Sequence, residues 1–338
     1  MARSPTSGLF PGSARSPGSV VPAAAVPGRP DTRLMAADAD TVRKVLSTTM
    51  LADLPITPVF GDCLLISGVD PADVLPAWRT ARAVMPSTGR RPVFLDGDAP
   101  LFDDVALPGP PLPSLPDLPD LPDEDLDDDF EADAWSGPEL TELDRQARAG
   151  DPWQALRRPW WDLPLTDDAF RAQVPAFDID FNIDSVRHQV PDPTLQAVNR
   201  CLFDRIRGDP ELLAQVPPYR DRLTGLHNWY RPDRVELLLA PTTEAHLLAA
   251  WAGFHGTLGQ HEVLAGVLLH WHDRWQADLV AGWETMLQFV VGRRPETADD
   301  ACELAYQITL LAGNLEMNLW ETALAVTRGD EWFLHDRP

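Results

Sequence analysis

The sequence predicts an α/β (α+β) protein, with a mixed β-sheet covered by helices in a C-terminal domain and a small β-α-β unit near the N-terminus. Two observations carry this prediction. Apolar runs of strand length alternate with segments in which apolar residues recur every three or four positions. The last hundred residues follow the order β-α-α-β-β-α-α-β, which requires a mixed sheet with helices packed on it.

Composition divides the 338 residues into five segments. Residues 1–37 are rich in Ser, Pro, Gly and Ala without a hydrophobic period, which predicts a disordered tail, and a translation start at Met35 is one hypothesis for its origin. Residues 38–98 are the β-α-β unit, residues 99–138 an acidic, Pro-rich linker, and residues 139–234 a middle connecting region. Residues 235–338 form the C-terminal domain.

The N-terminal unit is built from local signals. Asp40 or Thr41 can cap a first helix, and the apolar run Val59–Val69 predicts a strand with a bend near its start. Asp70–Asp73 combines a capping acid with Pro at the first helical position, which predicts a second helix. Pro92–Leu95 then predicts a strand. A β-α-β crossover of this kind favours parallel strands.

Charge is concentrated in the linker. The chain carries a net charge of −24, and residues 92–144 contain 17 Asp and Glu but no Lys or Arg. Such a field repels phosphate backbones, so we expect no nucleic-acid partner. Two interpretations of the linker remain open, a solvated spacer and an acidic docking arm for a partner with a basic surface.

The middle region carries weaker patterns. Phe177–Asp184 alternates strictly between apolar and polar residues, which predicts a strand with one wet face. The Asp192-Pro193 step predicts the start of a helix, and Pro210–Val216 predicts a shorter one. Trp153, Trp160 and Trp161 are expected to pack onto a domain face.

The C-terminal domain gives the clearest pattern. The expected elements begin with a buried strand at Val235–Ala240, a helix capped by Thr242 or Thr243 that runs through Trp251, and a helix with an apolar stripe at Leu264–Trp275. A hairpin at Leu279–Val291 and a helix capped by Thr297 follow, and a last helix ending near Gly329 leads to a final strand at Trp332–His335.

This block resembles a bacterial family known as domain of unknown function 4253. The resemblance rests on Leu237–Pro241, Trp271–Trp275, Met286–Val291, Pro295–Thr297 and Trp332–Asp336, with a weaker likeness at Trp78, Arg82 and residues 86–92. The chain departs from the family pattern at Leu311–Asn314, where a Cys-Pro-Asp-like step is expected, and in the final Leu-His-Asp. The resemblance implies the fold and no activity.

Established catalytic motifs are missing from the sequence. There is no GxSxG, HExxH or SxxK, and the glycines at Gly253, Gly256 and Gly259 do not follow a strand. Cys63, Cys201 and Cys302 are too scattered for a disulfide framework or a zinc cluster, which predicts free thiols in the cytoplasm. No apolar run is long enough to span a membrane. We therefore expect no metal, no cofactor and no membrane association.

The polar and aromatic residues of the recognised block are the candidate binding residues. Arg274 is expected to pair with a carboxylate and pin the helix end to the last strand. The leading functional prediction is a non-catalytic protein-interaction module, of which an immunity protein is one form. The alternative is a metal-dependent enzyme or small-molecule binder that uses C-terminal His, Asp and Arg residues. The candidate binding residues are Trp271, Asp273, Arg274, Trp332, His335 and Asp336.

Overall fold

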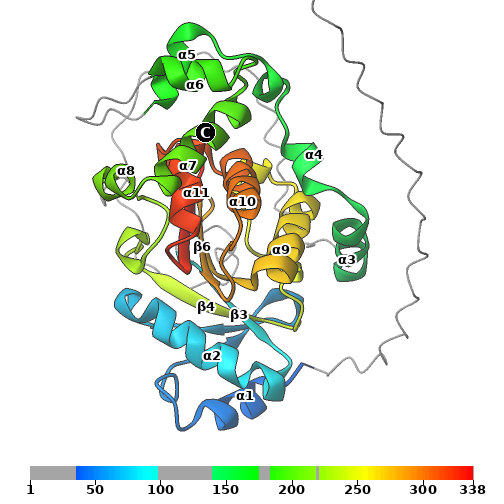
Figure 1. The fold of residues 1–338 in the computed structure, drawn as a ribbon. Helices are drawn as coiled ribbons and strands as arrows, with labels where there is room; N and C mark the ends of the chain where they lie inside the picture. The colour runs from blue at the N-terminus through cyan, green and yellow to red at the C-terminus, as the bar shows by residue number, and fades with distance from the viewer. Residues whose placement is uncertain (1–35, 98–138, 175–182, 218–220, 338) are drawn as a thin grey trace, which may run out of the picture. The chain divides into compact units, whose positions relative to one another are not determined.

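The computed structural model describes residues 36–97, 139–174, 183–217 and 221–337, which form helices around one seven-stranded sheet (Figure 1). The strand order is β1-β2-β4-β3-β5-β6-β7. β3 and β5 pair in parallel, and every other neighbouring pair is antiparallel, so the predicted mixed α/β fold is confirmed. The strands are β1 (Ile56–Pro58), β2 (Leu64–Ile66), β3 (Arg91–Asp96), β4 (Val235–Ala240), β5 (Ala277–Gly282), β6 (Met286–Val291) and β7 (Glu331–His335).

Strand β4 lies between β2 and β3, which both come from the segment predicted as a β-α-β unit. β2 and β3 are each antiparallel to β4, so they run parallel to one another, as expected for strands joined by a crossover helix. The segments 38–97 and 235–337 therefore both contribute strands to one sheet. The sequence alone does not reveal this arrangement, because β4 follows β3 only after a long intervening segment.

Both faces of β4 are covered, which explains why five of its six residues are apolar. Val235, Leu237 and Leu239 belong to a core that includes residues of α1 (Ala39–Leu46) and α2 (Val74–Thr88). Leu238 and Ala240 belong to the larger core on the opposite face.

Local capping fixes the two N-terminal helices. The Asp38 carboxylate, rather than Asp40 or Thr41, caps α1 and accepts a hydrogen bond from the Thr41 amide at 2.8 Å. Asp70 caps the 3₁₀ turn that leads into α2, as predicted, by accepting from the Ala72 amide at 2.8 Å. Gly89 ends α2 with φ 64°, a left-handed conformation that favours glycine.

The opposite face carries the remaining helices in two groups. The helices α9 (His261–Trp275), α10 (Ala298–Leu311) and α11 (Leu319–Val326) contribute buried residues to the larger core, and the middle region adds a second set of helices beside them (Figure 1). Asn199 ties the two groups together, because its side chain accepts from the Trp320 amide and donates to Gln173. The middle helices are α3 (Leu140–Ala149), α4 (Pro152–Leu156), α5 (Asp167–Gln173), α6 (Ile183–Gln189), α7 (Leu195–Gly208) and α8 (Pro210–Gln215).

Three expectations from the sequence differ from the structure. Of the strand expected at Val59–Val69, only Leu64–Ile66 is a strand, β2, because the bend expected at Gly61 and Asp62 is a turn with positive φ that separates β2 from β1. The helix expected after Thr242 is only a 3₁₀ turn at 246–250. Of the strand expected at Phe177–Asp184, residues 177–182 lie outside the described residues, and the last two residues begin α6. No helix of the described ranges is both long and apolar enough to cross a membrane.

Candidate functional site

The two tryptophans among the candidate binding residues lie in the core. Trp271 and Trp332 are fully buried, and their ring centroids are 5.7 Å apart in an edge-to-face arrangement. The Trp271 indole nitrogen donates to the Gln307 side-chain oxygen at 2.9 Å. Both side chains therefore stabilise the packing of α9 against the sheet, and neither is exposed to a ligand.

Arg274 forms ion pairs with α10 and not with the last strand. One Nη lies 2.6 Å from Asp300 and 2.9 Å from Glu303, and the guanidinium lies 5.0 Å from the Trp275 ring centroid. The expected carboxylate partner is therefore present, but on a different element. The reason is local, because the first turn of α10 concentrates acids, which are favoured at a helix N-terminus. The hydrogen bond to Asp300 raises the pKa of Arg274.

His335 and Asp336 lie at the other end of α10. Asp336 Oδ1 accepts the Gly313 amide at 3.1 Å, just beyond the C-terminus of that helix. His335 Nε2 lies 3.0 Å from Arg337 Nε, and burial followed by the Arg337 charge lowers the pKa of His335. The 14-residue helix is about 20 Å long at 1.5 Å per residue, so the candidate polar residues form two separate groups.

A pocket of about 440 Å³ lies between α9 and the turn from α3 to α4. Asp273 is exposed at its rim, and Arg274 also lines it. His270 lies edge-on to Trp153, with centroids 5.6 Å apart, and burial followed by the Arg274 charge lowers the pKa of His270. Arg148 is already paired with Asp144 at 2.8 Å. The pocket can therefore admit a small polar molecule but has no unpaired arginine to attract an anion.

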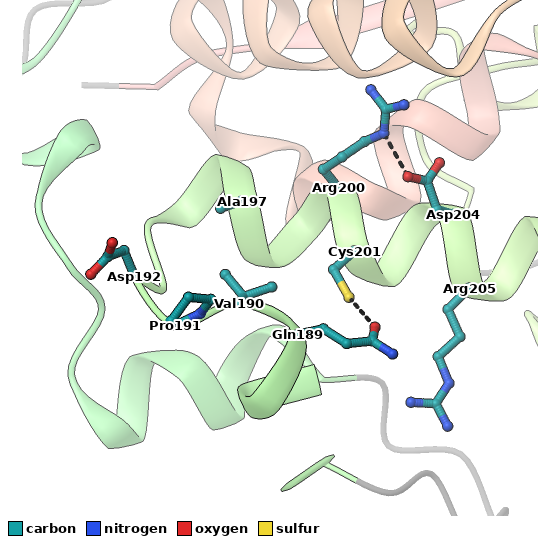
Figure 2. Close-up of a pocket in the computed structure, with 9 residues that line it drawn as sticks. All are labelled: Gln189, Val190, Pro191, Asp192, Ala197, Arg200, Cys201, Asp204 and Arg205. Atoms are coloured by element: carbon teal, nitrogen blue, oxygen red, sulfur yellow. Dashed lines mark hydrogen bonds and ion pairs between the residues drawn. The ribbon is translucent and has the colours of Figure 1, made fainter. Parts of the chain in front are cut away.

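A larger surface pocket of about 810 Å³ lies between α6 and α7 (Figure 2). In this pocket Arg200 pairs with Asp204 at 2.8 Å and with Asp299 of α10. The Cys201 thiol lies 3.1 Å from the Gln189 side-chain oxygen, and burial raises the pKa of the thiol (Figure 2). A protonated thiol beside an amide oxygen is a poor nucleophile, so this pocket does not assemble reactive groups.

The histidines are dispersed over the structure. His246 pairs with Asp144 at 2.7 Å, and His261 Nδ1 lies 2.7 Å from the Ala249 carbonyl oxygen. Within the described ranges no three His, Cys, Asp or Glu side chains come together in a group that could hold a metal ion.

A buried ion cluster joins four elements around Asp278 of β5. Its Oδ1 lies 2.8 Å from Arg91 of β3 and 3.0 Å from His272 of α9, and its Oδ2 accepts from Arg82 of α2 at 3.1 Å. Arg91 also donates to the Thr243 carbonyl oxygen at 2.7 and 2.9 Å. Sequence reasoning missed this cluster, although charged residues at positions 91 and 278, at the starts of two apolar strands, were a usable signal.

Another buried carboxylate, Glu236, lies in β4 at one end of the sheet. The Glu236 side chain is 4% exposed, and Arg234 Nη2 lies 3.3 Å from its Oε1. Its Oε2 is also buried, and no described residue donates a hydrogen bond to it. Glu236 was also missed, although it is the single charged residue of its strand.

Further acids lie near Glu236 in the chain or in register, at the end of the sheet where β3 ends and β4 begins. Asp96, the last residue of β3, is paired in register with Val235, and Asp233 precedes β4. The Gly97 amide donates to the Arg234 carbonyl oxygen at 3.2 Å, and the acidic run of the sequence begins at Asp98. We call Asp96, Asp233 and Glu236 the acidic end of the sheet.

These features define a mixed α/β protein with helices on both faces of its sheet. The family whose model matches, described as Domain of unknown function (DUF4253), covers residues 236–336. The resemblance seen in the sequence is thereby confirmed for the C-terminal hundred residues, which supply strands β4 to β7. No curated protein and no solved structure matches the chain.

Proposed function

We propose that this protein is a non-catalytic binding module whose ligand is another protein with a basic surface. The observation that carries the proposal is the acidic end of the sheet. Two of its acids, Asp233 and Glu236, line one pocket, and Glu236 is buried with an oxygen that lacks a donor among the described residues. The acidic run of the sequence starts at the next residue after Gly97.

Electrostatics supports a protein partner of this kind. With 17 acids and no basic residue between positions 92 and 144, the chain attracts positive surfaces and accelerates their encounter. Attraction between exposed charges is screened by salt over about 8 Å at physiological ionic strength. Binding through this region should therefore weaken strongly as salt rises.

The state of the other polar groups supports a role without catalysis. Arg274 is held by Asp300 and Glu303, and Asp336 is held by the Gly313 amide. Asp278 has three positively charged or donor partners. Groups held in this way are positioned to stabilise the fold, whereas a catalytic group needs an open coordination or hydrogen-bonding position.

The test is isolation and reconstitution of a complex. The full-length protein is used to capture a partner from its native lysate, and the partner is then identified, purified and titrated back by calorimetry. We expect a stoichiometric complex whose Kd rises about tenfold or more between 50 and 300 mM NaCl. Replacing the acids of residues 123–129 with their amides should weaken it. A partner with an acidic surface, or a salt-independent Kd, would contradict the proposal.

The second candidate function is binding of a small molecule, as an enzyme or as a receptor, in the pocket beside α9. The observation that favours it is that His270, Asp273 and Arg274 line one pocket of about 440 Å³. Elemental analysis of the purified protein and a thermal-shift screen of metabolites test it. Stoichiometric zinc, iron or manganese, or a metabolite whose stabilisation is lost in Asp273→Asn, would favour this function over protein binding.

A further inference from the structure

We propose that a pocket beside Glu236 is the anchor point for one cationic side chain, an arginine guanidinium or a lysine ammonium, of the partner protein. This inference rests on the proposed function and specifies how the partner is recognised. The pocket has a volume of about 420 Å³ and lies where residues 67–69 continue β2 beside the start of β4. We call it the Glu236 pocket, and Ser67, Gly68, Val69, Asp233, Arg234, Val235 and Glu236 line it.

The anchor is the half-satisfied carboxylate of Glu236. An ionised carboxylate offers about four acceptor positions, and burying one without donors is costly. Here Oε1 has one donor, at 3.3 Å from a half-exposed arginine, and Oε2 has none among the described residues. Buried polar groups are almost always hydrogen-bonded, and a donor from outside reaches this covered oxygen once the side chains that line the pocket shift.

The charge of the pocket indicates that the donor is a cation. Glu236 and Asp233 contribute two negative charges, and Arg234 contributes one positive charge. One additional cation would neutralise the pocket. Arg234 also demonstrates that a guanidinium can reach this carboxylate, although it precedes β4 and lies only two positions before Glu236 in the chain.

The approach of Arg234 depends on Gly97. A Cβ placed on Gly97 would lie 2.5 Å from Arg234 Cγ, so only glycine leaves room for the arginine on the β3 side of Glu236. The pocket itself is bounded by residues 67–69 from the β2 side. Arg234, which also lines the pocket, holds Oε1, and an incoming side chain can bind Oε2, as in a carboxylate shared by two guanidinium groups.

The walls suit a long side chain with a polar tip. Gly68 is exposed and presents no side chain, and a Cβ added there would meet only Leu54, at 3.8 Å. Val69 and Val235 supply apolar surface for the methylene stem. Lysine and arginine bury such stems along apolar surface while the charged group finds a polar partner.

The test measures binding of a fluorescent glycine–arginine repeat peptide to the full-length protein by anisotropy at 150 mM NaCl. We expect Glu236→Gln, which keeps the size of the side chain, to weaken binding about tenfold or more, as loss of a charge-assisted hydrogen bond predicts. The matched control is Glu211→Gln, which removes the same charge from an exposed position on α8 and should change Kd less than twofold. Ser67→Leu, which fills the pocket and keeps Glu236, should weaken binding as Glu236→Gln does.

The source of the cation is resolved by further probes. A peptide with citrulline in place of arginine should bind the native protein no more tightly than the arginine peptide binds Glu236→Gln. Free arginine and spermidine should compete only at much higher concentration than the peptide, and equal competition would overturn the assignment to a protein side chain.

The same measurements separate the two proposals. If the peptide binds with the expected salt dependence while Glu236→Gln and Glu211→Gln have equal Kd, the Glu236 pocket is not the anchor and the proposed function stands. If the arginine and citrulline peptides bind equally to every variant, both proposals are wrong. Circular dichroism of each variant verifies that it is folded, and Ser67→Leu tests the pocket independently should Glu236→Gln be unfolded.

Discussion

Replacing Asp278 with Asn tests the view that its ion cluster stabilises the fold. The substitution preserves the shape of the side chain and removes its charge. Arg91, whose side chain is 4% exposed, then loses this counterion and keeps neutral acceptors, the Thr243 carbonyl oxygen and the amide oxygen of the new side chain. Removing one partner of a buried ion pair typically costs about 3–5 kcal/mol. Because Arg82 is 27% and His272 is 35% exposed, part of the charge can be solvated, and we expect a loss of about 3 kcal/mol.

The measurement is urea unfolding at pH 7, followed by circular dichroism and tryptophan fluorescence. A fall in the midpoint at constant m-value reports lost stability without a change in the denatured state. Asp273→Asn is the control, because Asp273 is exposed on the neighbouring helix and should change the free energy of unfolding by less than about 0.5 kcal/mol. A loss below about 1 kcal/mol for Asp278→Asn would refute the reasoning.

The pH dependence gives a second, independent measurement on Asp278. Burial alone would raise the pKa of Asp278, but His272, Arg91 and Arg82 together outweigh it and hold the pKa well below its ordinary value. A carboxyl group with a lowered pKa in the folded state contributes stability that is complete above its unfolded pKa, about 3.9, and is lost as pH falls further. The difference between native protein and Asp278→Asn should therefore shrink as pH falls below about 4. A difference that does not shrink between pH 4 and the acid unfolding of the protein would contradict this assignment.

Two further predictions concern packing and thiol reactivity. Gly256→Ala should destabilise the protein by about 1–3 kcal/mol or more in urea unfolding, because its Cβ would lie 2.1 Å from a backbone oxygen, whereas Gly253→Ala, with no atom within 4 Å, should be close to neutral. Burial raises the pKa of Cys63 to about 12 and that of Cys302 to about 11, so iodoacetamide at pH 8 should alkylate Cys201 first. Peptide mass spectrometry measures the order of labelling. Faster labelling of Cys63 than of Cys201 would contradict this order.

The features that the sequence predicts well depend on neighbours in the chain. Thr297 caps α10 by accepting from the Asp300 amide at 3.1 Å, three residues away, and Asp70 acts in the same way at the turn before α2. The hairpin of β5 and β6 is likewise local, because only three residues join the strands. Capping and turn chemistry act over two to four residues, so residue types alone determine them.

The features that the sequence does not predict depend on distant partners. Arg91 and Asp278 are 187 positions apart, and their pairing follows from the parallel contact of β3 with β5. The insertion of β4 between β2 and β3 has the same origin, because apolar strands of similar length carry no local mark of their neighbour. Arg274 shows the same effect in the candidate site, because the sequence indicates a carboxylate partner but not that this partner, Asp300, lies on α10.

Asp278 and Glu236 together show how a structural carboxylate differs from a binding one. Both lie on strands and both are largely buried, but Asp278 has three internal partners and Glu236 has one. Loss of charge should therefore have opposite consequences at the two positions. At Asp278 it leaves a buried arginine without its counterion, whereas at Glu236 it removes a desolvated charge that is only partly compensated. We accordingly expect Glu236→Gln to unfold at a urea concentration equal to or above that of the native protein. A loss of stability comparable to that of Asp278→Asn would mean that Arg234 alone satisfies Glu236, and would remove the physical reason for an external cation.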